Sequence, residues 1–174
     1  MLRTSIGLLV GAMLFFVIAP NDASNLEAAQ RTCEANGKTA DLNFTVKDIN
    51  GKDVALSAFK GSVILLDFWA TWCPPCKKEI PGFIGLYNAY KPRGFVVLGV
   101  SVDESNSDVK KFIKQYKMNY PVLAGYERED LQKAYAPMPG FPTTFLIARD
   151  GSICFQHTGF TPLEEFESRI KSLL

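Results

Sequence analysis

The sequence contains one histidine, His157, and almost no net charge. A single histidine excludes every catalytic or metal site that needs two. Lys and Arg number 19 and Asp and Glu number 18, so no excess of positive charge is available to attract nucleic acid or an anionic surface. Internal repeats and low-complexity segments are also missing, which excludes a repeat architecture.

No apolar run reaches the length of about 20 residues that a membrane-spanning helix needs. The longest uncharged apolar run, residues 6–19, follows Arg3 and ends at Pro20. This length suits the hydrophobic region of a secretory signal. We interpret residues 1–24 as a cleaved signal peptide or an uncleaved anchor, both of which place the domain in the periplasm or elsewhere outside the cytoplasm. A core helix is the remaining alternative.

Residues 25–40 are polar and small and are predicted to form a linker. Residues 41–174 are long enough for one domain with a sizeable core. Two apolar segments in it, residues 63–69 and 95–100, lack any alternation of apolar and polar side chains, as strands covered on both faces do. Helical patterns follow each segment, over residues 74–90 and 107–117.

Two dipeptides with strong turn preference predict β-hairpins. Asn50-Gly51 lies between the short segments 43–46 and 54–56, and Asp150-Gly151 lies between 143–148 and 152–156. The second hairpin predicts an antiparallel edge on the sheet. Strands that alternate with helices predict an α/β domain with a mostly parallel central sheet and helices on both faces.

Three further segments complete the predicted domain. Residues 120–123 read as a short strand, and residues 127–135 as a helix. Residues 162–174 read as a closing helix, for which Thr161 is the expected N-cap and Glu164 its capping-box partner.

The most informative stretch is WATWCPPCKKEIP, residues 69–81, which follows a predicted strand and opens a predicted helix. A thiolate is the nucleophile in disulfide exchange, and a helix N-terminus stabilises negative charge. With Cys73 at the N-cap and Cys76 one turn further on, one sulfur can attack a partner's disulfide and the other can resolve the mixed disulfide. The spacing therefore predicts a redox-active dithiol.

Two other readings of this cysteine pair are weaker. A zinc site needs four ligands, so it would have to recruit Cys33, Cys154 and His157 in the absence of a second closely spaced pair. A purely structural disulfide that closes so short a loop would add little stability. The two intervening prolines and the strand–helix setting favour redox chemistry, with no metal and no cofactor.

The segment VILLDFWATWCPPCKKEIP, residues 63–81, resembles the active-site region of thioredoxin-like proteins. It is most similar to the exported TlpA/ResA subgroup, which includes the thioredoxins of cytochrome c maturation. The resemblance runs from residue 41 to the C-terminus and includes NGKDVALSAFKG, VLGVSVD and GFPTTFLIARDG. It implies a thioredoxin fold with a mixed central sheet flanked by helices, an N-terminal β-hairpin and an extra βα insertion.

The resemblance also implies an activity and partners. Members of this subgroup act mainly as thiol–disulfide reductants outside the cytoplasm. We therefore expect a monomer that reduces a disulfide-bearing protein and receives its electrons from a membrane thiol–disulfide carrier.

Several site residues follow from the resemblance by position. Cys73 matches the attacking cysteine, Cys76 the resolving one, and Trp72 the aromatic residue before them. Pro142 matches the cis-proline that lies beside the disulfide and presents the preceding backbone to a partner, and the bulky Phe141 is expected to shape which partner fits. The alternatives are simple surface packing for Trp72 and an ordinary trans proline at the start of a strand for Pro142.

Two acidic residues are candidate proton handlers. Asp67 stands six residues before Cys73, as does the buried acid of thioredoxins, and burial would raise its pKa and let it take the proton of Cys76. The alternative is a partly solvated carboxylate at the strand end. Glu79 matches an acid of the ResA-like subgroup, and it is either a second proton handler or a surface charge near a helix N-terminus.

Both residues between the cysteines are prolines, so neither Pro74 nor Pro75 offers an N–H to the Cys73 thiolate. The N–H of Cys76 remains. Weaker stabilisation of the reduced form makes the dithiol a better reductant, so we predict a reducing site.

Cys33 and Cys154 lie outside this motif. The sequence favours unpaired thiols, with Cys154 a small core residue in the last hairpin strand. A Cys33–Cys154 disulfide that pins the linker to the sheet is the alternative, since cysteines can pair in an oxidising compartment. His157 is expected at the surface.

Two other classes of function share this fold. A thiol peroxidase usually carries Thr or Ser three residues before its reactive cysteine, but here that residue is Ala70, and Thr71 stands one place too late. A copper carrier of the kind that serves cytochrome oxidase uses a wider cysteine spacing and a histidine in a matching loop, which His157 does not provide.

Overall fold

The computed structural model describes residue 33 and residues 37–174. Its central sheet has five strands in the order β5-β4-β3-β6-β7. Strands β3, β4 and β5 are parallel, whereas β6 is antiparallel to both of its neighbours, so the mixed sheet with an antiparallel edge is confirmed. The strands are β3 (Val63–Trp69), β4 (Phe95–Ser101), β5 (Val122–Ala124), β6 (Thr143–Ile147) and β7 (Ile153–Thr158).

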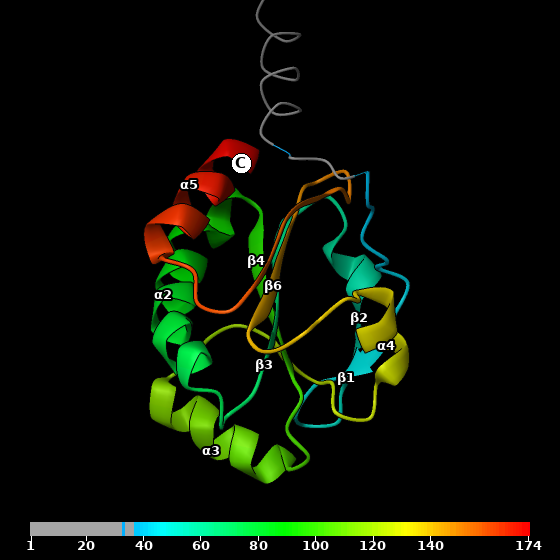
Figure 1. The fold of residues 1–174 in the computed structure, drawn as a ribbon, viewed down its shortest axis with the longest axis vertical. Coiled ribbons are helices and arrows are strands. Elements are labelled where there is room, and N and C mark those ends of the chain that lie inside the picture. The colour runs from blue at the N-terminus through cyan, green and yellow to red at the C-terminus, as the bar shows by residue number, and fades with distance from the viewer. Residues whose placement is uncertain (1–32, 34–36) are drawn as a thin grey trace, which may run out of the picture.

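Helices cover both faces of this sheet (Figure 1). Helices α2, α3 and α5 lie on one side, and α4 lies on the other with the hairpin β1–β2. The α3–β5 unit inserted after β4 is the predicted extra βα element. The helices are α2 (Pro74–Tyr90), α3 (Asn106–Tyr116), α4 (Glu129–Ala134) and α5 (Leu163–Leu173), the hairpin strands are β1 (Thr45–Lys47) and β2 (Asp53–Ala55), and short 3₁₀ turns are η1 (Leu56–Phe59) and η2 (Lys91–Arg93).

The central strand β3 explains the unbroken apolar run in the sequence. All seven of its residues are buried, because both of its faces are covered. Leu65 and Trp69 pack in the core beneath α2, whereas Leu66 and Phe68 pack in the second core, on the α4 side. Asp67 therefore points toward α2, since side chains alternate along a strand.

The N-terminal end of the described chain is fastened to the β6–β7 hairpin. Thr39 forms an antiparallel bridge with Ser152, and Cys33 is joined to Cys154 by a disulfide. The prediction of two unpaired thiols is therefore wrong. The segment before β1 runs beside the hairpin turn and thus carries Cys33 to Cys154, although 121 positions separate the two residues.

The start of α5 differs from the prediction. Pro162 is its N-cap, and no side chain caps the helix. The expected capping role of Thr161 is wrong, because the helix begins one residue later than predicted and the Thr161 hydroxyl makes no hydrogen bond within the described residues. The other predicted strands and helices lie within two residues of the observed ends.

The predicted signal or anchor, residues 1–24, and most of the predicted linker lie outside the described residues. Within the described part of the chain, the helices are too short or too polar to span a membrane.

Candidate active site

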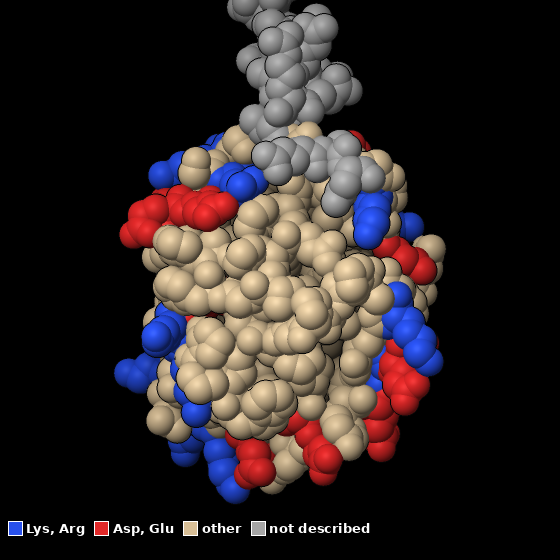
Figure 2. Space-filling view, viewed as in Figure 1, with Lys and Arg blue, Asp and Glu red and all other residues tan. Residues whose placement is uncertain are grey.

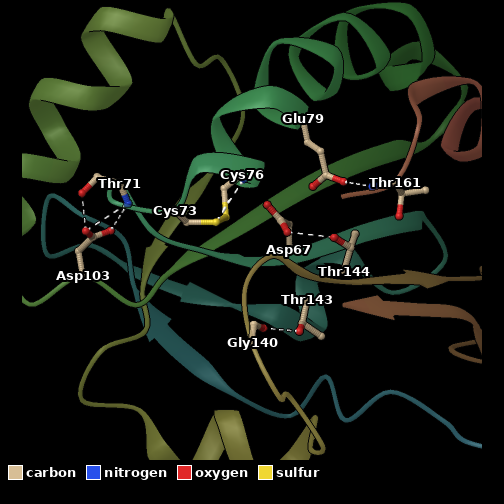
Figure 3. The surroundings of a disulfide bond; sticks show 10 residues. All are labelled: Asp67, Thr71, Cys73, Cys76, Glu79, Asp103, Gly140, Thr143, Thr144 and Thr161. Atoms are coloured by element: carbon tan, nitrogen blue, oxygen red, sulfur yellow. Dashed lines mark hydrogen bonds between the residues drawn. A yellow bond between two sulfur atoms is a disulfide. The ribbon is translucent and has the colours of Figure 1, made fainter. Parts of the chain in front are cut away.

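Cys73 and Cys76 form a disulfide at the N-terminus of α2 (Figure 3). Cys73 is the N-cap, as predicted, and its Sγ accepts a hydrogen bond of 3.2 Å from the N–H of Cys76. The two side chains are only 2% and 1% exposed. The end of the helix dipole therefore acts directly on the Cys73 sulfur.

The two prolines limit the donors that this sulfur can use. Pro74 and Pro75 occupy the first two positions of α2. An N-cap side chain normally accepts from the N–H of the second or third helical residue. The second residue is Pro75, which has no N–H, so Cys76 supplies the single first-turn donor.

The loop between β3 and α2 is held by an acid that the sequence did not single out. Asp103, just beyond β4, accepts hydrogen bonds from the Thr71 N–H at 2.9 Å and from the Thr71 hydroxyl at 2.5 Å. Ser101 donates a further bond to it at 2.8 Å. Asp103 stands at the end of the VLGVSVD motif, but its partner in the loop becomes apparent only when β3 and β4 lie side by side.

Asp67 lies in the core below the disulfide. Its side chain is 1% exposed, and its Oδ1 accepts a hydrogen bond of 3.1 Å from the hydroxyl of Thr144 on β6. Burial raises the pKa of Asp67 well above its usual value, and the nearby charge of Glu79 raises it further. The partly solvated strand-end alternative is therefore wrong.

Glu79 is also buried, at 4% exposure, so the surface-charge alternative is wrong as well. Its Oε1 accepts a 2.6 Å hydrogen bond from the Thr161 N–H, because this face of α2 packs against the loop that precedes α5. Burial raises the pKa of Glu79 to about 7, although the Thr161 bond opposes the shift. Figure 3 shows the carboxyl groups of Asp67 and Glu79 pointing into the same space beside Cys76.

The outer rim of the site is aromatic. Trp72 is 62% exposed, and its ring meets that of Phe141 edge to face at 6.1 Å. The Phe141–Pro142 bond is cis, as predicted. Within the described residues, no hydrogen bond engages the backbone of Phe141, whereas the Pro142 carbonyl accepts from the Gly159 N–H at 2.8 Å.

A hollow of about 780 Å³ opens beside this rim. Trp72, Phe141 and Tyr126 contribute its aromatic side chains. The site thus presents a buried disulfide, a free backbone segment next to it and a surface hollow.

The remaining candidate ligands lie elsewhere. His157 is exposed on β7 and stacks on Phe155, as expected of a surface residue. In the described part of the chain, no three His, Cys, Asp or Glu side chains gather in a way that could hold a metal ion.

A disulfide at the N-terminus of the helix that follows the central strand, together with a cis-proline whose preceding residue contacts Trp72, defines a thiol–disulfide oxidoreductase of the thioredoxin fold. Residues 37–156 match the AhpC/TSA family, and the chain belongs to that family.

Similar proteins carry the same activity in their names. The chain is 39% identical to the thiol-disulfide oxidoreductase ResA of Bacillus thuringiensis, over 75% of each protein. It is 34% identical to ResA of Geobacillus kaustophilus, over 99% of this chain and 94% of the relative. A thiol:disulfide interchange protein of Chlorobium tepidum superposes with a TM-score of 0.70 at 28% identity, over 80% of this chain and 99% of that one.

Proposed function

We propose that this oxidoreductase is an extracytoplasmic reductase of protein disulfides, with Cys73 as the attacking and Cys76 as the resolving cysteine. The observation that carries the proposal is the N-cap position of Cys73 with a single backbone donor in the first turn. The helix dipole makes Cys73 a nucleophilic thiolate, while the scarcity of donors keeps the reduced pair from being strongly stabilised. A dithiol of that kind gives its electrons away readily.

The reaction has two exchange steps. The Cys73 thiolate attacks one sulfur of the substrate disulfide, so that a mixed disulfide forms and the first substrate sulfur leaves as a thiolate. Cys76 then loses its proton and attacks the Cys73 sulfur, which releases the second substrate thiolate and closes the Cys73–Cys76 disulfide. Two electrons pass to the substrate, and its two thiolates take up protons. A dithiol donor restores the reduced protein by the same exchange in reverse.

Asp67 is proposed to accept the proton of Cys76 in the second step. A carboxylate with a raised pKa lies closer to a thiol in proton affinity, so the transfer is less uphill than it would be to an ordinary aspartate. Glu79 supports this role because its nearby charge keeps proton affinity high in the shared buried space.

The surface around Phe141 and Pro142 is proposed to bind the substrate chain. Between residues 134 and 163 the sequence contains only two charged residues, Arg149 and Asp150. Figure 2 shows the corresponding broad uncharged face, with charged side chains confined to its rim. This neutral surface suits an extended, uncharged segment of an unfolded protein, whereas the hollow that Phe141 shares with Trp72 is lined by Glu127, Glu129 and Asp130 and is acidic.

Two features support a location outside the cytoplasm. Residues 1–24 have the pattern of a secretory signal or anchor. The Cys33–Cys154 disulfide is remote from the active site and belongs to the structural kind that persists in oxidising compartments. A substrate from cytochrome c maturation and a membrane thiol carrier as donor follow from the resemblance to the TlpA/ResA subgroup.

A trapping experiment tests the proposal. The Cys76→Ser variant of the full chain, reduced and mixed with oxidised insulin, should accumulate a mixed disulfide through Cys73. Cys73→Ser should form none, and the wild-type protein should release reduced insulin chains. A wild-type protein that leaves insulin oxidised, or a Cys76→Ser variant that traps nothing, contradicts the assignment.

Peroxide consumption in the same samples tests the peroxidase class. The hydroxyl of Thr71 is bound to Asp103 and is not turned to the Cys73 sulfur, so the site lacks the hydroxyl that a peroxidase would use. We expect no peroxide turnover above that of free dithiothreitol.

A further inference from the structure

Four buried polar side-chain atoms have no hydrogen-bond partner within the described residues. They are Trp69 Nε1, Glu79 Oε2, Tyr120 OH and Thr161 Oγ1. All four lie on the α2 side of the sheet: Trp69 and Tyr120 belong to the core beneath α2, and Thr161 is bonded to Glu79 on α2 itself. Buried polar groups that lack a protein partner usually hold an ordered water. Two of these atoms thus lie in the core beneath α2, and the other two belong to residues that line a small hollow between α2 and the loop before α5. Buried water is expected near each pair.

The strand register places Tyr120 next to Asp67. Asp67 on β3 pairs with Gly99 on β4, whose N–H donates to the carbonyl of Pro121 at 3.0 Å. A Cβ added to Gly99 would come within 2.9 Å of Trp69 Nε1 and 3.3 Å of the Tyr120 ring. The indole nitrogen of Trp69 and the ring of Tyr120 thus lie over Gly99, which has no side chain and pairs with Asp67.

The Tyr120 hydroxyl is a permanent donor in this space. Burial raises its pKa well above the usual value, and the charges of Asp67 and then of Glu79 raise it further. The other titratable group packed on it is Tyr87 of α2, whose ring meets the Tyr120 ring at 6.3 Å. Asp48, Lys52 and Asp53 of the hairpin line the outer groove that Tyr120 borders.

We propose that Tyr120 is a positioning residue of the proton-transfer site: through a buried water that it shares with the free oxygen of Glu79, its hydroxyl donates to the Asp67–Glu79 carboxyl pair. The donated bond stabilises the anionic form of the pair and so keeps a base ready for the Cys76 proton. This inference rests on the proposed transfer from Cys76 to Asp67. If the Tyr120 hydroxyl bound no water, it would not stabilise the anionic form of the carboxyl pair.

The test is the Tyr120→Phe variant, with Tyr87→Phe as the matched control. The control removes a hydroxyl from the adjacent ring, which touches Tyr120 but carries no unpartnered buried oxygen. The carboxyl carbons of Asp67 and Glu79 are followed by ¹³C NMR against pH in the oxidised full chain. Loss of a hydrogen bond to a charged acceptor should raise the apparent pKa of the pair by about one unit in Tyr120→Phe, and the control should leave it in place.

The melting temperature of Tyr120→Phe is a second measurement, and it distinguishes a hydroxyl that binds a buried water from one that binds nothing. Removing a hydroxyl that anchors a buried water should lower the melting temperature of Tyr120→Phe, whereas removing an unbonded buried hydroxyl should leave it unchanged or raise it. A variant that titrates like the wild type, or is at least as stable, overturns the proposal.

The titration uses no substrate and no reductant, so it reports on Tyr120 even if the protein fails to reduce insulin. Failure of the proposed function would appear as a wild-type protein without insulin reduction. Failure of the Tyr120 role would appear as an unshifted titration in a variant of an active protein.

Discussion

Pro75 stands at the one position of α2 where an N–H would give the Cys73 sulfur a second donor. Replacing it by alanine restores that N–H without adding bulk. We predict that Pro75→Ala stabilises the Cys73 thiolate and makes the redox potential less negative by about 30 to 60 mV, the equivalent of one hydrogen bond to a charged group. Equilibration with glutathione followed by thiol trapping measures the change.

Pro74→Ala is the matched control for this substitution. Pro74 occupies the first helical position, whose N–H does not normally reach the N-cap side chain. The redox potential of the Pro74→Ala variant should stay close to that of the wild type. Equal shifts in both variants would show that the prolines act through chain stiffness and not through the missing donor.

The buried Glu79 carboxyl should make stability depend on pH. Its pKa is raised from 4.5 to about 7, so between these values the folded protein holds a proton that the unfolded chain releases. The stability contributed by this group is complete below the lower value and is lost as the pH rises through the upper one. Asp67, with its pKa also raised, acts in the same direction.

We therefore predict that the free energy of unfolding of the wild type falls between about pH 5 and pH 8, and that Glu79→Gln makes this profile flatter. Urea denaturation at both pH values measures it. Glutamine keeps an oxygen for the Thr161 N–H, and Glu164→Gln on the exposed face of α5 serves as the control. A Glu79→Gln profile as steep as the wild-type one would contradict the assigned pKa.

At the scale of elements, the position of the disulfide depends on how β4 holds the end of β3. Asp103 accepts hydrogen bonds from both the N–H and the hydroxyl of Thr71, so it fixes the loop that leads to the N-cap of α2. We predict that Asp103→Ala lowers the free energy of unfolding by about 1 to 3 kcal/mol, because it leaves the Thr71 donors without their acceptor. It should also slow insulin reduction.

Glu104→Gln is the control for Asp103→Ala. Glu104 is the next acidic residue, but it is exposed and bonds only the hydroxyl of Tyr126. Its stability and activity should match those of the wild type. If Asp103→Ala proves as stable as this control, Asp103 does not hold the loop.

Elements with a strong local pattern were predictable from sequence. The unbroken apolar run of β3 is the pattern of a strand covered on both faces. The Cys-Pro-Pro-Cys motif marks the start of α2, because Cys73 is the N-cap and the prolines fill the first two helical positions. The burial of Glu79 was not predictable, because it depends on the loop that packs on α2 from the far end of the chain. Thr161 was mistaken for a cap because α5 begins one residue later than its sequence pattern indicated.

At the scale of the whole molecule, the Cys33–Cys154 disulfide ties the N-terminal segment to the β6–β7 hairpin. A cross-link between distant residues restricts the unfolded chain, so Cys33→Ser should lower the free energy of unfolding by about 2 to 4 kcal/mol. The redox potential of Cys73–Cys76 should not change, since the two disulfides lie in different parts of the molecule. Denaturation and thiol trapping measure the two quantities.

A double variant, Cys33→Ser with Cys154→Ser, controls for the free thiol that the single variant leaves behind. Both variants lack the bond and should lose comparable stability. A Cys33→Ser protein as stable as the wild type would contradict a structural role. The pairing itself could not be deduced from sequence, because only the alignment of Thr39 with Ser152 brings the two ends together.

The proposed reductase function requires a reducing Cys73–Cys76 pair, and the redox potential of this pair can be measured by equilibration with glutathione or dithiothreitol and thiol trapping. The single donor to the Cys73 sulfur predicts a value near or below about −200 mV, among the thioredoxin-like reductants. A value near about −120 mV would place the protein with the strong periplasmic oxidants and would contradict the proposed direction of electron flow.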